Sequence, residues 1–173
     1  MKRVTMNDFR WLGKPDRWEK NYREVKLSVD GMQNLPGGPL LLAVSDEDFS
    51  LSLVTSIAPE GGFCGLCLFH SEQSYAAVGL SSTHLLLESA IHSYKTRSTL
   101  PLQTGDESIT WRMEHQGEAI RIGYQLPSEE SVEWVVTTTL PGMEKAVSFG
   151  PFFTNGTGTP FEATAHSLRY AKK

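Results

Sequence analysis

The stretch that most constrains the fold is residues 62–81, GFCGLCLFHSEQSYAAVGLS. Two apolar runs, residues 63–69 and 75–80, flank a short polar loop. Each run has the length of a β-strand, and neither is long enough to form a buried helix. The stretch therefore predicts a buried β-hairpin, around which the rest of the chain is organised.

Strand patterns continue on both sides of this hairpin. Short apolar or alternating runs predict further strands at residues 24–29, 40–44, 49–57, 85–94, 108–115, 119–126, 132–139, 146–153 and 161–170. Gly and Pro turn signals separate them, and residues 101–105 are predicted to form a connection. Only residues 141–145 look helical. Many short strands at this spacing, with almost no helix, predict an all-β sandwich or barrel.

Length and charge limit the class of protein. A chain of 173 residues is long enough to bury a core, so we expect a single domain over residues 1–173. Residues 1–22 contain Trp11 and Trp18 but are broken by Gly13 and Pro15, which predicts an irregular segment packed back onto the domain. The net charge of −4 argues against nucleic-acid binding, which normally uses a basic surface.

The sequence shows no membrane or secretion pattern. No apolar run approaches the roughly 20 residues of a membrane-spanning helix, so we expect no membrane partner. The first residues, MKRVTMNDFRW, contain basic residues without the apolar run of a secretory signal. We therefore expect a cytoplasmic protein.

The cysteines and histidines predict neither a disulfide nor a metal site. Cys64 and Cys67 lie three residues apart in a predicted strand, hence about 10 Å apart and on opposite faces. A disulfide needs Cα atoms within about 7 Å, so two buried free thiols are expected. The five histidines show no metal-binding spacing, and we expect no metal and no cofactor.

Three segments carry motifs in a characteristic order and spacing: residues 11–18, WLGKPDRW; residues 65–80, GLCLFHSEQSYAAVGL; and residues 149–168, FGPFFTNGTGTPFEATAHSL. Together they resemble the regulation-of-enolase-like domains of unknown function. The first is similar to a W-x-x-x-P-x-x-W opening and the second to a Gly-hydrophobic hairpin with an aromatic residue and a second glycine. The third is similar to a V-G-P…G-F-E-A finish. The hairpin and the finish also resemble the C-terminal module of family 43 β-xylosidases.

This resemblance implies a concanavalin A-like jelly roll, an all-β sandwich of two curved antiparallel sheets. One sheet is convex and the other concave, and in related domains the concave face often meets carbohydrate. The chain departs from the family where relatives often carry charge and this sequence has Ala77 and Ser81. It also has residues 128–131 in place of an Asp-Gly turn before Trp134. A polar site formed by those positions elsewhere is expected to be absent or altered here.

Carboxylates are the candidates for catalysis, because sandwich glycosidases use two acids on one face. A retaining enzyme holds them about 5–5.5 Å apart. The sequence has no E-x-D-x-x-E run, so no catalytic residue is assigned. The strand acids Glu88, Glu114 and Glu133 are the weak candidates, and Glu88 with Glu114 is of interest only if both lie on the concave face. Solvated surface is the simpler interpretation of each.

Aromatic and polar strand residues are the candidates for ligand binding, because sugar rings stack on Trp and Tyr and their hydroxyls need polar partners. On the strand at residues 108–115, Trp111 is expected to face the core, whereas Arg112 and Glu114 face a polar groove. The candidate set is Arg112, Glu114, Tyr124, Tyr94, His92 and Trp134, with Arg97 and Arg121 as further candidates. Core packing or ordinary surface is the alternative interpretation of each.

Three functions remain open from the sequence. The leading hypothesis is a stand-alone, non-catalytic domain that binds carbohydrate or a glycoconjugate. The second is a small glycoside hydrolase with a carboxylate pair on the concave sheet. The third is a protein-interaction module, such as a homodimer formed through a sheet face or edge. The missing acid-pair motif disfavours the hydrolase.

Overall fold

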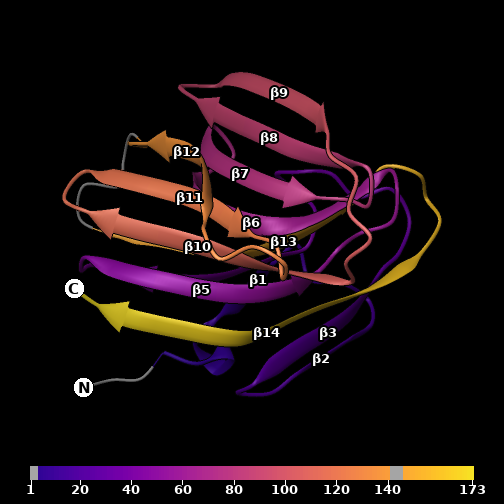
Figure 1. Ribbon diagram of the computed structural model, residues 1–173, viewed down its shortest axis with the longest axis horizontal. Helices are drawn as coiled ribbons and strands as arrows, with labels where there is room; N and C mark the ends of the chain where they lie inside the picture. Colours follow the sequence, from indigo (N-terminus) through magenta and orange to yellow (C-terminus); the bar gives the residue numbers. More distant parts are fainter. Residues whose placement is uncertain (1–3, 141–145) are drawn as a thin grey trace.

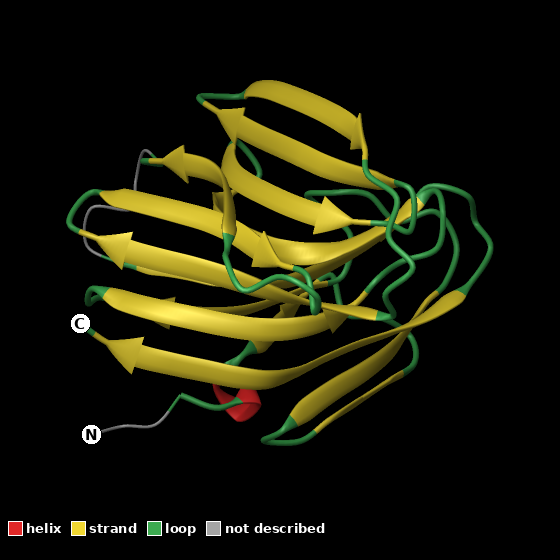
Figure 2. Ribbon diagram, in the orientation of Figure 1, coloured by secondary structure: helices red, strands yellow, loops and turns green. Residues whose placement is uncertain are grey.

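The computed structural model describes residues 4–140 and 146–173, and in them the chain forms a jelly-roll sandwich of two antiparallel seven-stranded sheets. Figure 1 shows the two layers of strands. Figure 2 shows that strands dominate the fold, with one short 3₁₀ helix, η1 (Met6–Asp8), in the described residues. The predicted all-β sandwich is therefore confirmed.

We call the two layers sheet A and sheet B. Sheet A has the order β1 (Arg10–Leu12), β4 (Leu40–Ser45), β13 (Val147–Asn155), β6 (Gly62–Ser71), β7 (Ser74–Leu80), β8 (His84–Ile91), β9 (Tyr94–Pro101). Sheet B has the order β12 (Glu133–Thr138), β11 (Ala119–Gln125), β10 (Ser108–Gln116), β5 (Phe49–Ser56), β14 (Phe161–Lys172), β3 (Glu24–Val29), β2 (Trp18–Lys20). The predicted central hairpin is β6–β7, with Leu66 opposite Val78.

Two predictions about strands were wrong. Residues 85–94 are not one strand, because the chain turns at His92 and Ser93, which both have positive φ, and returns as β9. Every residue of β9 is exposed, so it lacks the alternation by which strands are recognised. The segment 1–22 is also not wholly irregular, because β1 and β2 pair at the edges of the two sheets. The helical interpretation of residues 141–145 lies outside the described residues.

The main core fills the space between the sheets. At its centre the indole Nε1 of Trp111 donates a 2.8 Å hydrogen bond to the hydroxyl of Thr55 on the neighbouring strand. Phe49 packs against Phe149 and Tyr170, with ring centroids 4.7 and 5.2 Å away. Met6 and Phe9 of the N-terminal segment are fully buried in this core.

A second apolar cluster lies on the outer face of sheet A, away from the main core. It consists of Leu35, Leu40, Phe63, Cys67, Phe69, Tyr75, Ala77, Leu86, Ala90 and Phe152. Leu35 belongs to the loop before β4 and is 4% exposed, so this loop covers part of the face. Both faces of the β6–β7 hairpin are consequently buried, which explains its two unbroken apolar runs.

The two glycines of the hairpin motif have a packing role on this outer face. Gly65 lies opposite Gly79 on β7 and opposite Phe152 on β13. A Cβ at Gly79 would stand 2.7 Å from Cζ of Phe152, and one at Gly65 would overlap the carbonyl oxygen of Val78. Gly79 therefore makes room for the Phe152 ring, and Gly65 allows the backbones of β6 and β7 to approach closely.

Candidate functional site

Among the residues that the structure describes, the outer face of sheet A carries one buried carboxylate, that of Glu88. On β8, Leu85 and Leu87 pack on the main core, whereas Leu86 and Ala90 join the outer cluster. Glu88 lies two residues from each of Leu86 and Ala90, so it shares their face and points outward, between Ala77 of β7 and Arg97 of β9. Its side chain is only 6% exposed. A buried carboxylate needs partners that offset its desolvation.

Three side chains supply those partners. The hydroxyl of Tyr75 donates a 2.7 Å hydrogen bond to Oε2 of Glu88. Nε of Arg97 lies 3.8 Å from Oε1, and Nζ of Lys95 lies 4.0 Å from Oε2. Burial raises the pKa of the Tyr75 phenol, and its hydrogen bond to Glu88 raises this pKa further. Tyr75 therefore stays a protonated donor.

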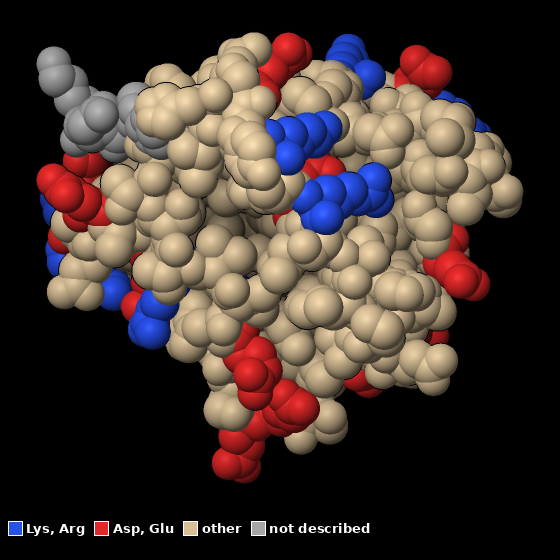
Figure 3. Space-filling view, turned by 90° about the horizontal axis from the view of Figure 1, so that it is seen from above, with Lys and Arg blue, Asp and Glu red and all other residues tan. Residues whose placement is uncertain are grey.

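The two cations form the exposed rim of this arrangement, which we call the Glu88 site: Tyr75, Glu88, Lys95 and Arg97. The Lys95 and Arg97 side chains are 50% and 51% exposed. Lys95 also donates a 3.2 Å hydrogen bond to the carbonyl oxygen of Leu35, which ties β9 to the covering loop. Figure 3, which views the molecule from the side of β8 and β9, shows basic side chains flanking a recessed acidic one.

The candidate carboxylates do not converge. Glu88 lies on the outer face of sheet A, whereas Glu114 alternates with the buried Met113 and lies on the outer face of sheet B. The sandwich core separates them, and packed sheets alone are about 10 Å apart. Glu133 pairs with Tyr124 and so lies on the opposite face of sheet B from Glu114. The shared concave face required for a Glu88–Glu114 pair is not present.

Arg112, Glu114 and Trp134 lie on the outer face of sheet B. Oε2 of Glu114 is 2.8 Å from Arg121 Nη2 and 3.2 Å from Lys173 Nζ, so it is already paired. The hydrogen bond from Arg121, supported by Lys173, lowers the pKa of Glu114. The Arg121 guanidinium lies 3.9 Å from the centre of the Trp134 ring and covers it. A cavity of about 200 Å³ lies beside Glu114 and Arg121.

The other predicted ligand-binding residues lie apart from this group. Tyr124 is 9% exposed and packs edge-to-face on Trp111, with ring centroids 6.2 Å apart. His92 lies in the turn between β8 and β9, and Tyr94 begins β9 with 76% of its surface exposed. The six predicted ligand-binding residues therefore lie in three places: the outer face of sheet B, the core beside Trp111, and the turn between β8 and β9. Sequence reasoning overlooked Tyr75 and Lys95, although Lys95 and Arg97, two apart on one strand, share a face.

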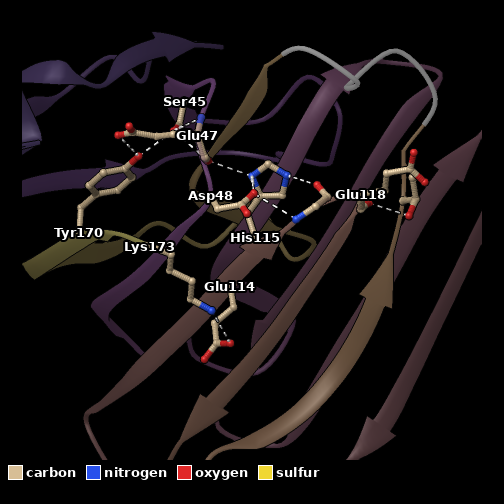
Figure 4. Close-up of polar contacts among 10 residues, drawn as sticks. Ser45, Glu47, Asp48, Glu114, His115, Glu118, Tyr170 and Lys173 are labelled. Atoms are coloured by element: carbon tan, nitrogen blue, oxygen red, sulfur yellow. Dashed lines mark hydrogen bonds and ion pairs between the residues drawn. The ribbon is translucent and has the colours of Figure 1, made fainter.

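A polar cluster at the end of the sandwich has a structural role (Figure 4). The Tyr170 hydroxyl lies 2.6 Å from that of Ser45 and donates to Oε1 of Glu47 at 3.1 Å. The His115 ring bonds the carbonyl oxygens of Glu47 and Gly117 at 3.0 and 2.8 Å. These bonds join strand ends and leave the His115 nitrogens occupied.

Three further observations describe the rest of the surface. A cavity of about 970 Å³ opens at the edge of the sandwich beside Asn21, Tyr22 and His166. No three His, Cys, Asp or Glu side chains are grouped to hold a metal ion within residues 4–140 and 146–173. In the same part of the chain, no helix is long and apolar enough to span a membrane.

Comparison with known proteins supports the fold but does not establish a family. No family model matches the sequence, and no curated protein is similar enough to count as a relative. Among solved structures, a functionally unknown protein from Saccharomyces cerevisiae matches with a TM-score of 0.82 and 14% identity. The match covers 98% of this chain and 99% of that one.

Two other similar solved structures are a GH43 protein and a carbohydrate-binding module. The GH43 protein BlXynB of Bacillus licheniformis matches with a TM-score of 0.77 and 13% identity, over 99% of this chain but 38% of that one. The carbohydrate-binding module CBM66 from Bacillus subtilis matches with a TM-score of 0.58 and 10% identity, over 95% and 96% of the two chains. The predicted similarity to family 43 proteins is thus confirmed for the fold, and identities this low carry no further conclusion.

Proposed function

We propose that this chain is a non-catalytic, concanavalin A-like domain that binds a carbohydrate or glycoconjugate at the Glu88 site. The observation that carries the proposal is a buried carboxylate under two half-exposed cations on the outer face of sheet A. Sugar hydroxyls both donate and accept hydrogen bonds. A carboxylate acceptor beside guanidinium and ammonium donors offers them both kinds of partner.

The surrounding face supports binding rather than hydrolysis. The other two candidate acids, Glu114 and Glu133, belong to sheet B, whereas Glu88 lies on the outer face of sheet A, so these three do not form the facing acid pair that a glycosidase needs. Tyr75 is packed in the buried outer cluster, and its hydroxyl holds Glu88 through a hydrogen bond. The likeness of the fold to CBM66 and to GH43 proteins is in keeping with this proposal.

The test is a glycan array probed with the full chain, followed by calorimetric titration of each hit. The wild-type chain is compared with Arg97→Ala and with the matched control Arg112→Ala, an exposed arginine on sheet B. We expect Arg97→Ala to weaken binding about tenfold or more and Arg112→Ala to leave it unchanged. If saccharide binding is lost in Arg112→Ala instead, the binding site lies on the predicted polar face of sheet B. No saccharide binding at all would overturn the proposed function.

A further inference from the structure

The charges on the outer face of sheet A differ in sign from those of the whole chain. The chain has a net charge of −4. On the strands of this face, within the described residues, the outward-pointing charged side chains are Arg10, Lys95, Arg97 and the single acid Glu88. Arg10 lies on β1, at the opposite edge of the sheet from β9, so the local charge at the Glu88 site comes from Lys95, Arg97 and Glu88. These three side chains leave one positive charge in excess on an acidic protein, and such an excess attracts anions.

The cations of the Glu88 site keep unused hydrogen-bonding capacity. Their distances to Glu88, 3.8 and 4.0 Å, exceed the 2.7–3.2 Å of an N–H···O hydrogen bond. In the part of the chain that the structure describes, Arg97 makes this one ion pair and no hydrogen bond. Its guanidinium also lies 6.0 Å from the centre of the Phe63 ring. The planar fork of an arginine matches a carboxylate, sulfate or phosphate group through two parallel bonds.

On the outer face of sheet A, the aromatic rings of the described strands are too buried for a sugar ring to stack on them. Phe63, Phe69, Tyr75 and Phe152 are 5%, 8%, 0% and 0% exposed. A ligand held here must therefore gain its affinity from polar and ionic contacts rather than from a ring platform. One carboxylate, already bonded by Tyr75, balances only one of the two cations.

We infer that the ligand of the Glu88 site is an acidic saccharide, whose anionic group lies between Lys95 and Arg97 while its hydroxyls meet Glu88. This inference rests on the proposed carbohydrate-binding function and adds the class of ligand. The anionic group is the carboxylate of a uronic acid or a sulfate or phosphate ester, each of which presents two oxygens that can accept two parallel hydrogen bonds from a guanidinium.

The experiment uses matched probes on the full chain: trigalacturonate against its methyl ester, and sulfated and phosphorylated oligosaccharides against their unmodified forms, alongside an array of neutral and acidic glycans. Titrations at about 20 and 200 mM salt compare wild type with Arg97→Gln, Lys95→Gln and the control Arg112→Gln. We expect acidic probes to bind about tenfold more tightly than their neutral partners. This preference disappears in Arg97→Gln, shrinks in Lys95→Gln and at high salt, and persists in Arg112→Gln.

The outcomes separate this inference from the proposed function. Preference for the uronate pair identifies a carboxylate, and preference for an ester pair identifies a sulfate or phosphate. Binding of neutral glycans equal to or tighter than that of acidic ones overturns the inference and leaves the proposed function standing. An acidic preference that Arg112→Gln abolishes and Arg97→Gln does not would also overturn it. Absence of binding to every glycan overturns both.

Discussion

The hydroxyl of Tyr75 donates a 2.7 Å hydrogen bond to Oε2 of Glu88, and both side chains point away from the core of the sandwich. Neither side chain is exposed by more than 7%. Because the carboxylate is buried, the bond from Tyr75 replaces water that Glu88 cannot reach. The pair therefore links the stability of the fold to the candidate site.

Replacing Tyr75 by Phe should lower the free energy of unfolding by about 1–3 kcal/mol, because it leaves a buried carboxylate with one hydrogen bond fewer. Urea unfolding followed by tryptophan fluorescence measures the change. Tyr170→Phe is the matched control, since its hydroxyl bonds Ser45 and Glu47 at a partly exposed site, and a smaller loss is expected. Equal stabilities of Tyr75→Phe and wild type would show that the bond contributes nothing.

The sequence predicts the hairpin well because local pattern and tertiary packing agree there. Residues 63–69 and 75–80 are apolar on both faces, and both faces are buried. Strand β9 could not be predicted in the same way. It pairs with β8 on one side only and is exposed throughout, so its residues carry no hydrophobic period.

The packing role of Gly150 gives a second test of the fold. A Cβ at this position would overlap the carbonyl oxygen of Leu41 on β4 and stand 3.2 Å from the ring of Phe9. Backbone cannot move aside as a flexible side chain does, so Gly150→Ala should destabilise the protein by about 3 kcal/mol or more, or prevent folding. Chemical denaturation of the purified protein, or its soluble yield, measures the effect.

The control for this substitution is Gly105→Ala. A Cβ at Gly105 would meet no atom within 4 Å, and its φ is not in the left-handed region. Alanine there should leave stability unchanged or raise it by up to about 1 kcal/mol through the unfolded chain. If Gly150→Ala proved as stable as Gly105→Ala, β13 and β4 would have to separate more easily than their packing indicates.

The candidate site was less accessible to sequence reasoning than the fold. Glu88 is a strand acid like several others in the sequence, and its burial depends on Tyr75 and on the loop of Leu35, more than 10 residues away in either case. Trp134 illustrates the opposite error. The sequence suggests an open ring for sugar stacking, yet Arg121 from the adjacent strand covers it at 3.9 Å.

Acid should lower the stability of the fold, because it protonates Glu47 and Glu114, which pair with Lys172 and Lys173 at the end of β14. The hydrogen bond from Lys172 holds the pKa of Glu47 below its usual 4.5, and that from Arg121 does the same for Glu114. A carboxyl whose pKa is lower in the folded state stabilises the fold above its unfolded pKa, and this stability is lost as pH falls through the folded value. We therefore expect urea midpoints to fall between about pH 5 and pH 3.

The double variant Glu47→Gln/Glu114→Gln tests this assignment. It should be less stable than wild type at pH 7 and should lose less stability on acidification. Glu60→Gln, in an exposed turn, is the control and should follow the wild-type curve. If the urea midpoints of wild type and double variant fall in parallel as the pH is lowered, the acid sensitivity arises from other carboxylates.

The two thiols provide the last prediction, because they lie in different cores. Cys64 packs between the sheets and Cys67 in the outer cluster, which confirms that they face opposite sides of β6 and form no disulfide. Burial raises the pKa of Cys64 to about 12 and also raises the pKa of Cys67, to which the charge of Glu88 contributes. Thiolate, the reactive form, is therefore scarce at neutral pH.

We expect Ellman's reagent to leave both thiols of the native protein unmodified at pH 8 and to titrate two per chain in about 6 M guanidinium. Glu88→Gln serves as the matched variant, because it removes the charge beside Cys67 and leaves Cys64 unaffected. If Cys67 alone becomes reactive in this variant, Glu88 protects this thiol through its charge or its contacts, while the main core stays closed. Rapid labelling of Cys64 in the native wild type would contradict its burial between the sheets.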